Sequence, residues 1–187
     1  MRKVASRLRT AWLARRVLAE SVVACPAEAV WGLSCDPFSS EAVEQLLALK
    51  QRPVSKGLIV VAGHLDMLAP VLEPLPAEQR AELALSWPGA NTWLVPNRGF
   101  FPPWITGTSD EVAVRVPASP ALVALSREVG GPLVSTSANP AGALPAKHGF
   151  QVVRYFGPKL ARAVGEVDLR GKPSTIRRVG TRDVLRA

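Results

Sequence analysis

The sequence has few cysteines, few aromatic residues and no long apolar run, and each absence excludes a class of protein. Cys25 and Cys35 are the only cysteines in 187 residues, so neither a disulfide framework nor a cysteine-rich metal centre can be built. We expect both to be small buried residues, and two free thiols fit a reducing cytoplasm. No apolar run reaches the roughly 18 residues of a membrane-spanning helix, so no membrane association is expected.

The chain is also poor in residues that support covalent or metal chemistry. His64 and His148 are its only histidines, and neither belongs to a strong nucleophile motif. No glycine-rich Walker or dinucleotide-binding fingerprint occurs, and we identify no protein ligands for a metal ion. A Ser–His–Asp type of catalysis is therefore not indicated.

Positive charge, by contrast, is abundant. There are 23 Lys and Arg against 15 Asp and Glu, which gives a net charge of +8. A basic surface attracts nucleic acid, nucleotides or other anions, and charge alone does not choose among them. Aromatic residues make up only 6% and are not interleaved with basic ones, so a stacking platform for RNA is not indicated. We expect any RNA binding to be weak, nonspecific and salt-dependent.

The first twenty residues allow two interpretations. Their arginines and one lysine all precede the first acid, Glu20, as in a mitochondrial presequence. However, Leu8, Trp12, Leu13 and Val17 recur at helical spacing and lead directly into a strand, which favours the first helix of the domain. No secretory signal is evident, and we expect a cytoplasmic protein.

Strand and helix patterns alternate along the whole chain. A helix is predicted over residues 40–50, with Ser40 as a possible cap, and further helices over 7–19, 65–72, 77–86, 120–129 and 149–156, with two or three short strands after the last of them. Strands are predicted at 21–25, 58–62, 92–95, 111–116 and 132–136, with a loop over 97–110. This pattern predicts a single α/β domain over residues 1–187, built on a twisted mixed sheet with flanking helices.

Three groups of polar residues are candidates for chemistry. Lys50, Arg52 and Lys56 surround Pro53, where a helix must end, and a loop there could direct all three at one phosphate. The alternative is a solvated charged turn at a helix C-terminus.

The other two groups lie on strands. Residues 135–139, Ser-Thr-Ser-Ala-Asn, follow an apolar strand and could wrap a phosphate or carboxylate; an ordinary Ser/Asn turn is the alternative. Arg115 lies on the face opposite Val112 and Val114. An inward arginine is costly unless it meets an anion, although an arginine on a solvent face is more common.

Together, six stretches of the chain resemble the YrdC-like threonylcarbamoyl-AMP synthase family, in its single-domain bacterial type. In family order, these stretches are Pro26–Leu33, Leu49–Pro53 with Lys56–Leu58, Trp87–Gly89 with Thr92, Val112–Pro117, Pro132–Asn139 and Pro173–Ile176. Each is weak alone, but chance agreement of all six is improbable.

The resemblance implies a YrdC-like fold with a basic concave surface and a nucleotidyltransferase activity. ATP, L-threonine and bicarbonate would give threonylcarbamoyl-AMP and pyrophosphate. Other proteins would then transfer the threonylcarbamoyl group to the adenosine next to the anticodon of certain tRNAs. Mg²⁺ is expected on the triphosphate, and catalysis should be mainly charge neutralisation and alignment.

The same resemblance implies roles for individual residues. Lys50, Arg52 and Lys56 would act in catalysis and face the phosphates of ATP. The remaining expected contacts are Ser137, Asn139 and Arg186 on the nucleotide side, and Arg115, Ser135 and Ser174 on the threonine side.

The chain departs from the family pattern at three places. Ala27 replaces a threonine that contacts the substrate, Ala90 and Asn91 replace a proline and an apolar residue, and Ala141 replaces a serine. Two alternatives stay open: a non-catalytic RNA-binding or ribosome-associated module, and a carbamoyl-adenylate enzyme that uses a different amine.

Overall fold

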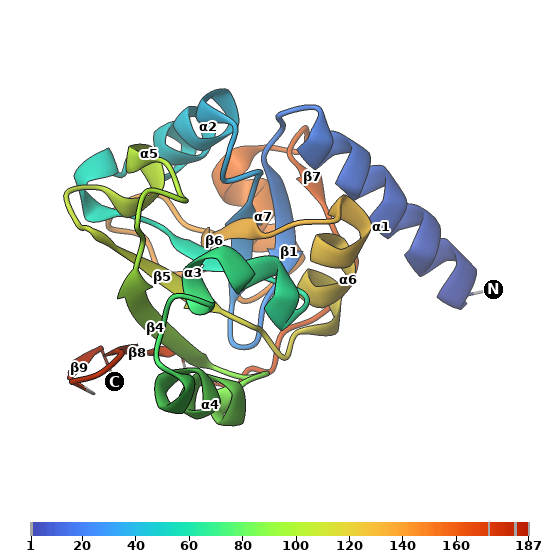
Figure 1. Ribbon diagram of the computed structural model, residues 1–187. Coiled ribbons are helices and arrows are strands. Elements are labelled where there is room, and N and C mark those ends of the chain that lie inside the picture. The colour runs from blue at the N-terminus through green and yellow to red at the C-terminus, as the bar shows by residue number, and fades with distance from the viewer. Residues whose placement is uncertain (1, 172, 182, 187) are drawn as a thin grey trace.

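The computed structural model describes residues 2–171, 173–181 and 183–186 (Figure 1). Its elements are, in chain order, α1 (Arg2–Leu18), β1 (Val23–Pro26), β2 (Trp31–Ser34), α2 (Ser40–Lys50), η1 (Val54–Lys56), β3 (Ile59–Val61), η2 (Leu65–Leu68), α3 (Ala69–Leu72), α4 (Ala77–Ser86), β4 (Asn91–Pro96), α5 (Pro103–Thr106), β5 (Glu111–Arg115), α6 (Pro120–Val129), β6 (Leu133–Ser137), α7 (Gly149–Phe156), β7 (Ala161–Arg162), β8 (Thr175–Arg178) and β9 (Val184–Arg186).

One sheet joins the first strand to the last. Within the described residues it has nine strands in the order β7-β1-β2-β6-β3-β5-β4-β8-β9. Parallel pairs such as β3–β5 occur beside antiparallel pairs such as β4–β5. The predicted α/β fold with a mixed sheet and flanking helices is therefore confirmed.

The centre of the sheet is buried on both faces. On β6, Leu133 belongs to one apolar core and Val134 to another, and on β3 the same holds for Val61 and Val60. Successive side chains of a strand point to opposite faces, so each face has its own core. The larger core also holds Trp31, Trp93 and Phe101.

The smaller core is covered by α1 and α6. Leu13 and Val17 of α1 are buried with Leu122 of α6, and Figure 1 shows the two helices side by side with the N-terminal end of α1 extending beyond α6. The expected apolar stripe of α1 is therefore only half correct. Leu8 and Trp12 are 67% and 42% exposed, because the ten residues of α6 cannot cover all seventeen of α1.

Most predicted elements occur with nearly the predicted bounds. Three elements were not predicted: the strand β2, the short 3₁₀ helix η1, and the short helix α5, which lies inside the predicted loop over 97–110. The helix α2 is capped by Ser39 rather than Ser40, since the Ser39 hydroxyl accepts a 3.1 Å hydrogen bond from the Ala42 N–H. A four-residue helix opened by prolines and a strand containing Gly32 give little periodic signal.

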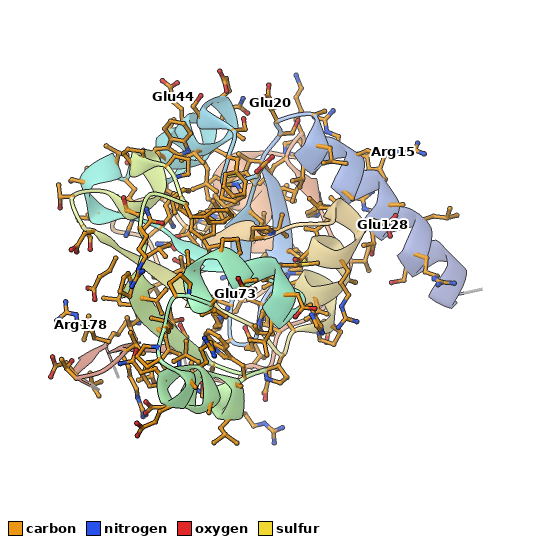
Figure 2. The ribbon with its side chains drawn as sticks, in the orientation of Figure 1. Arg15, Glu20, Glu44, Glu73, Glu128 and Arg178 are labelled. Carbon is orange, nitrogen blue, oxygen red and sulfur yellow. The ribbon has the colours of Figure 1, made fainter. Side chains whose placement is uncertain are left out.

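Most charged side chains are not buried, with Lys50 and Arg115 as exceptions, whereas both cysteines are. Figure 2 shows Arg15 and Glu44 at the periphery of the molecule. Cys25 and Cys35 are buried and free, as predicted, and burial raises the pKa of the Cys25 thiol to about 12. Among the described residues, no helix is long and apolar enough to cross a membrane.

We predict that Leu13→Ala destabilises the protein by about 2–5 kcal/mol, because it removes a buried side chain between α1 and α6. Chemical denaturation of both proteins measures this change in unfolding free energy. The control is Leu8→Ala, the same substitution on the exposed side of the helix, which should change stability by less than about 0.5 kcal/mol. Equal effects would show that α1 does not pack on the domain as described.

Candidate active site

A cavity of about 520 Å³ lies over the part of the sheet that α1 and α6 do not cover. Strand alternation explains its floor: on β6, Leu133 is buried beneath the helices, whereas Ser135 and Ser137 continue the same face into the cavity. Register then aligns Ser135 with Ile59 of β3 and Ile59 with Ala113 of β5. The floor thus combines small, apolar and hydroxyl side chains.

Seven of the nine residues that the sequence placed in the site line this cavity. They are Arg52, Lys56, Arg115, Ser135, Ser137, Ser174 and Arg186. Four of these are cations, whereas the acids in the lining are Glu28 and Glu111. Glu111 is held by Arg178, whose Nε lies 3.0 Å from both of its carboxylate oxygens. The cavity therefore matches the predicted basic concave surface.

Arg115 is the most buried of the lining cations, with 7% of its surface exposed. Its Nη2 lies 3.2 Å from Glu28 Oε2 in an ion pair, while its Nε has no hydrogen-bond partner among the described residues. Burial lowers the pKa of Arg115, Glu28 opposes that shift, and Arg186 adds to it. A buried guanidinium that keeps an unused N–H is suited to bind an anion, and a carboxylate fits its planar edge.

Ser174 lies at the centre of a chain of polar contacts on another wall. Its hydroxyl oxygen accepts from Thr92 Oγ1 at 2.9 Å and from Arg186 Nη2 at 3.0 Å. Arg186 also donates to the Ser174 carbonyl from Nε and Nη2, at 3.1 and 2.8 Å. Because two donors already serve its oxygen, the Ser174 hydroxyl proton is left to donate to a ligand.

Arg52 and Lys56 occupy the short loop around η1. Arg52 Nη2 donates to the carbonyls of Lys56 and Gly57 at 3.1 and 2.9 Å, which folds this loop around the guanidinium. Lys56 is the last residue of η1 and is exposed. Gly107 fixes the loop from the other side: a Cβ there would lie 2.7 Å from the Gly57 nitrogen, so only glycine permits this close approach.

The structure does not bring Lys50 and Asn139 to the cavity wall. Lys50 is 6% exposed, and its ammonium group donates to the carbonyl oxygens of Ser137 and Asn139, at 3.0 Å for the latter. The Asn139 amide donates to the carbonyls of Pro140 and Ala143 at 3.1 and 2.8 Å. Both side chains thus hold the turn after β6, while Asn139 Oδ1 is buried and has no hydrogen-bond partner in the part of the chain that the structure describes.

Sequence reasoning assigned no role to several residues that line the cavity, above all Glu28 and Gly32. Glu28 follows Ala27 in a stretch that carried the family resemblance, and that was its only signal. Gly32 adds no side chain to the floor of the cavity, where a Cβ would come within 3.2 Å of the Thr136 carbonyl oxygen. Ala27 also lines the cavity.

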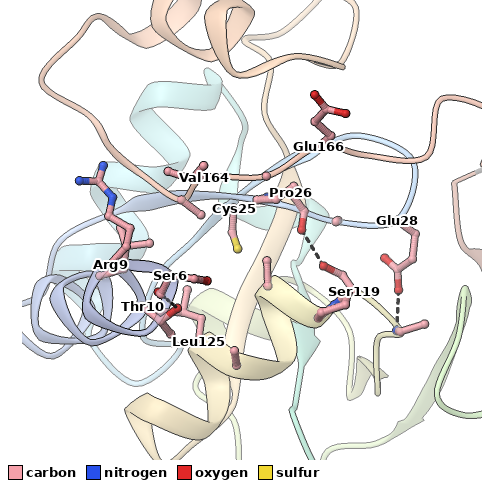
Figure 3. Close-up of a pocket in the computed structure, with 18 of the residues that line it drawn as sticks. Ser6, Arg9, Thr10, Cys25, Pro26, Glu28, Ser119, Leu125, Val164 and Glu166 are labelled. Carbon is pink, nitrogen blue, oxygen red and sulfur yellow. Dashed lines mark hydrogen bonds between the residues drawn. The ribbon is translucent and has the colours of Figure 1, made fainter. Parts of the chain in front are cut away.

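A second cavity of about 980 Å³ lies on the other side of Glu28. Figure 3 shows it between α1, the end of β1, the start of α6 and the segment around Val164. Its lining is mainly apolar, and Ala27 and Glu28 are shared with the first cavity. The 27–28 turn is therefore the wall between the two.

Comparison with known proteins places this chain in a family. The family model Sua5/YciO/YrdC, described as "Telomere recombination", matches residues 16–187, and the chain belongs to this family. It is 51% identical over 166 residues to the threonylcarbamoyl-AMP synthase of Cellvibrio japonicus, covering 88% of each chain. With that of Pseudomonas aeruginosa PAO1 it shares 48% over 182 residues, covering 97% and 98%.

Solved structures agree on the fold. P. abyssi Sua5 complexed with L-threonine has a TM-score of 0.83 at 27% identity, covering 92% of this chain and 51% of that one. The chain therefore spans about half the length of that protein. Escherichia coli YciO has a TM-score of 0.84 at 18% identity, covering 96% and 89%, and this likeness concerns the fold alone.

The environment of Lys50 generates a prediction about pH. Burial, with Arg52 adding to it, lowers the pKa of Lys50 from its ordinary 10.5 to about 8. Between these values the unfolded chain keeps a proton that the folded protein has lost, so the unfolding free energy rises with pH over that window. We expect the stability of the wild type relative to Lys50→Met to increase from pH 8 to about 10.5 and to be constant below pH 8.

Urea denaturation at a series of pH values measures this difference. The control is Lys159→Met, since Lys159 is exposed and its removal should give a difference that does not change across the same window. A pH-independent difference for Lys50→Met as well would show that Lys50 is not held as the structure places it.

Proposed function

We propose that this chain synthesises L-threonylcarbamoyl-AMP from L-threonine, bicarbonate and ATP, with release of pyrophosphate. The observation that carries the proposal is the buried Arg115 guanidinium with an unused N–H, in a cavity lined by three further cations. Relatives named threonylcarbamoyl-AMP synthase match the chain over nearly its whole length. A related protein, P. abyssi Sua5, has been solved with L-threonine.

The reaction joins two anions, and the lining suits that task. The deprotonated threonine amine first attacks the carbon of bicarbonate, so that a C–N bond forms, a C–O bond breaks, water leaves and a carbamate results. An oxygen of this carbamate then attacks the α-phosphorus of ATP, a new P–O bond forms, and the bond to pyrophosphate breaks. Arg52, Lys56 and Arg186 would neutralise the phosphates, with Ser137 donating to them, while Arg115, Ser135 and Ser174 would hold the threonine carboxylate. Fixed cations in a cavity stabilise the developing charge with little reorganisation.

Lys50 and Asn139 would contribute through the turn that they hold. Their hydrogen bonds fix residues 137–143 beside β6. We infer that they align Ser137 and its backbone for the nucleotide rather than reach the phosphates from their present positions. The role of Lys50 in catalysis would then be to position this turn.

Mg²⁺ is proposed to accompany ATP. Both carboxylates of the lining already face a cation, Glu28 with Arg115 and Glu111 with Arg178, and the described residues hold no group of three or more potential metal ligands. These residues fit a metal ion that is held mainly by the phosphate oxygens. When bound, it would neutralise charge on the triphosphate.

The wider setting follows from the product. A threonylcarbamoyl adenylate is an activated acyl donor, so we propose that other proteins use it to modify the adenosine next to the anticodon of tRNA, in the cytoplasm. Among the described residues, no contact and no cavity lining favours an RNA-binding role without catalysis, and any RNA binding is proposed to be weak and nonspecific.

Pyrophosphate release tests the proposed function together with the residues assigned to ATP and those assigned to threonine. With wild type, release should require ATP, bicarbonate and threonine. Arg115→Lys should raise the KM for threonine, and Arg52→Ala the KM for ATP, each by about 10- to 100-fold, the range for one lost charge-assisted hydrogen bond. Each variant controls for the other, and Arg127→Lys, which alters an arginine bound to the Gly63 carbonyl outside the cavity, should change neither. Threonine-independent release by wild type would contradict the proposal.

Ala27 provides a second test, because it lies in the lining where relatives are expected to have a threonine. Ala27→Thr should lower the apparent KM for L-threonine about threefold to tenfold, as one added neutral hydrogen bond would. Valine has nearly the same shape as threonine but no hydroxyl, so Ala27→Val should not lower the KM for L-threonine. If another amine supports turnover and threonine does not, the chain is a carbamoyl-adenylate enzyme with a changed substrate.

A further inference from the structure

Glu28 is fixed more firmly than any role assigned so far would require. Its backbone carbonyl accepts from the Asp168 N–H at 2.9 Å, and its Oε1 accepts from the Ala118 N–H at 2.9 Å. Figure 3 shows this second bond beside the larger cavity. Close by, Ser119 Oγ donates to the Pro26 carbonyl at 2.7 Å. The turn that carries Glu28 is thus joined to the segment after β5.

The second carboxylate oxygen of Glu28 is not used in the same way. Oε2 is buried and accepts no hydrogen bond from the described residues, although it lies 3.2 Å from Arg115 Nη2. The Arg115 Nε is likewise buried without an acceptor. A buried charged group with an unfilled hydrogen-bonding position is costly. The ion pair therefore compensates the charges of the two groups and leaves one acceptor and one donor unused.

These two positions are complementary to one kind of ligand. An α-amino acid has its carboxylate and its ammonium group on the same carbon atom. A site that binds both groups therefore needs a cation and an anion of the protein close to each other. A carboxylate fits the unused Nε of Arg115, and an ammonium fits the unused Oε2 of Glu28. Among the described residues of the lining, the other carboxylate is that of Glu111, which is occupied by two bonds from Arg178.

We propose that Glu28 binds the α-ammonium group of the amino-acid substrate and selects amino acids over carboxylates that lack an amine. This inference rests on the proposed function. The ammonium group must lose a proton before its nitrogen attacks bicarbonate, and the nitrogen of the resulting carbamate carries no positive charge, so the contact is strongest before that step. Glu28 therefore acts mainly on the binding of free threonine, and its loss should raise the KM for threonine much more than it lowers kcat.

The test compares L-threonine with 3-hydroxybutanoate, which keeps the carboxylate and the hydroxyl but lacks the amine. Binding of each to the full chain is measured by calorimetry. The wild type should bind threonine at least about tenfold more tightly, as a charge-assisted hydrogen bond predicts. Equal affinities would overturn the role of Glu28 without any variant being needed.

The variant Glu28→Gln then separates contact from positioning. Its amide oxygen can still accept from the Ala118 N–H, while its amide nitrogen donates and cannot receive an ammonium. We expect threonine to bind about 10- to 100-fold more weakly and 3-hydroxybutanoate to bind as before. If both ligands weaken equally, Glu28 acts only by positioning Arg115, and the proposal is wrong. Glu166→Gln, the same change at an exposed position of the second cavity, should alter neither affinity.

Pyrophosphate release by the wild type distinguishes a failure of this inference from a failure of the proposed function on which it rests. Threonine-dependent release together with equal affinities for the two ligands removes only the role of Glu28. Absence of both threonine binding and threonine-dependent release removes the function and the inference together.

Discussion

The rest of the site is arranged around the guanidinium of Arg115, which is buried at the end of the central strand β5. Arg115 is placed there by register, since its Cα pairs with Val61 in the part of the sheet that the helices begin to cover. Its charge cannot be left in an apolar layer without compensation. Glu28 supplies part of that compensation from the turn between β1 and β2, and a free N–H remains.

The other parts of the site are arranged around the same open face of the sheet. Small residues keep the space free, with Gly32 on the floor and Ala27 in the wall. The η1 loop reaches the rim because Gly57 and Gly107 let two backbone segments approach closely. The C-terminal strands bring Ser174 and Arg186 to the opposite wall, where Thr92 of β4 completes the polar chain. Anion binding therefore depends on segments from the beginning, middle and end of the sequence.

The three basic residues around Pro53 show how local sequence and tertiary position differ. Their spacing indicated a phosphate-binding loop, and Arg52 and Lys56 do line the cavity. Lys50, the last residue of α2, instead lies beneath the turn after β6 and binds its carbonyls. Helix periodicity directs Lys50 inward with Val43 and Leu46, whereas the residues beyond Pro53 are free of that constraint. A charged residue at a helix end can thus organise a site from behind.

Local patterns in the sequence predicted the fold class and most element positions, because strand alternation and helix periodicity are local, and because Val112 and Val114 define which face Arg115 must occupy. The family resemblance supplied nine site residues, of which seven line one cavity. Neither source indicated how much of α1 is covered, that Lys50 faces carbonyls, or that Glu28 meets Arg115 across 87 residues of chain. Those outcomes depend on which elements pack together and in what register, and no local pattern of residues encodes the partner that a buried charge will find.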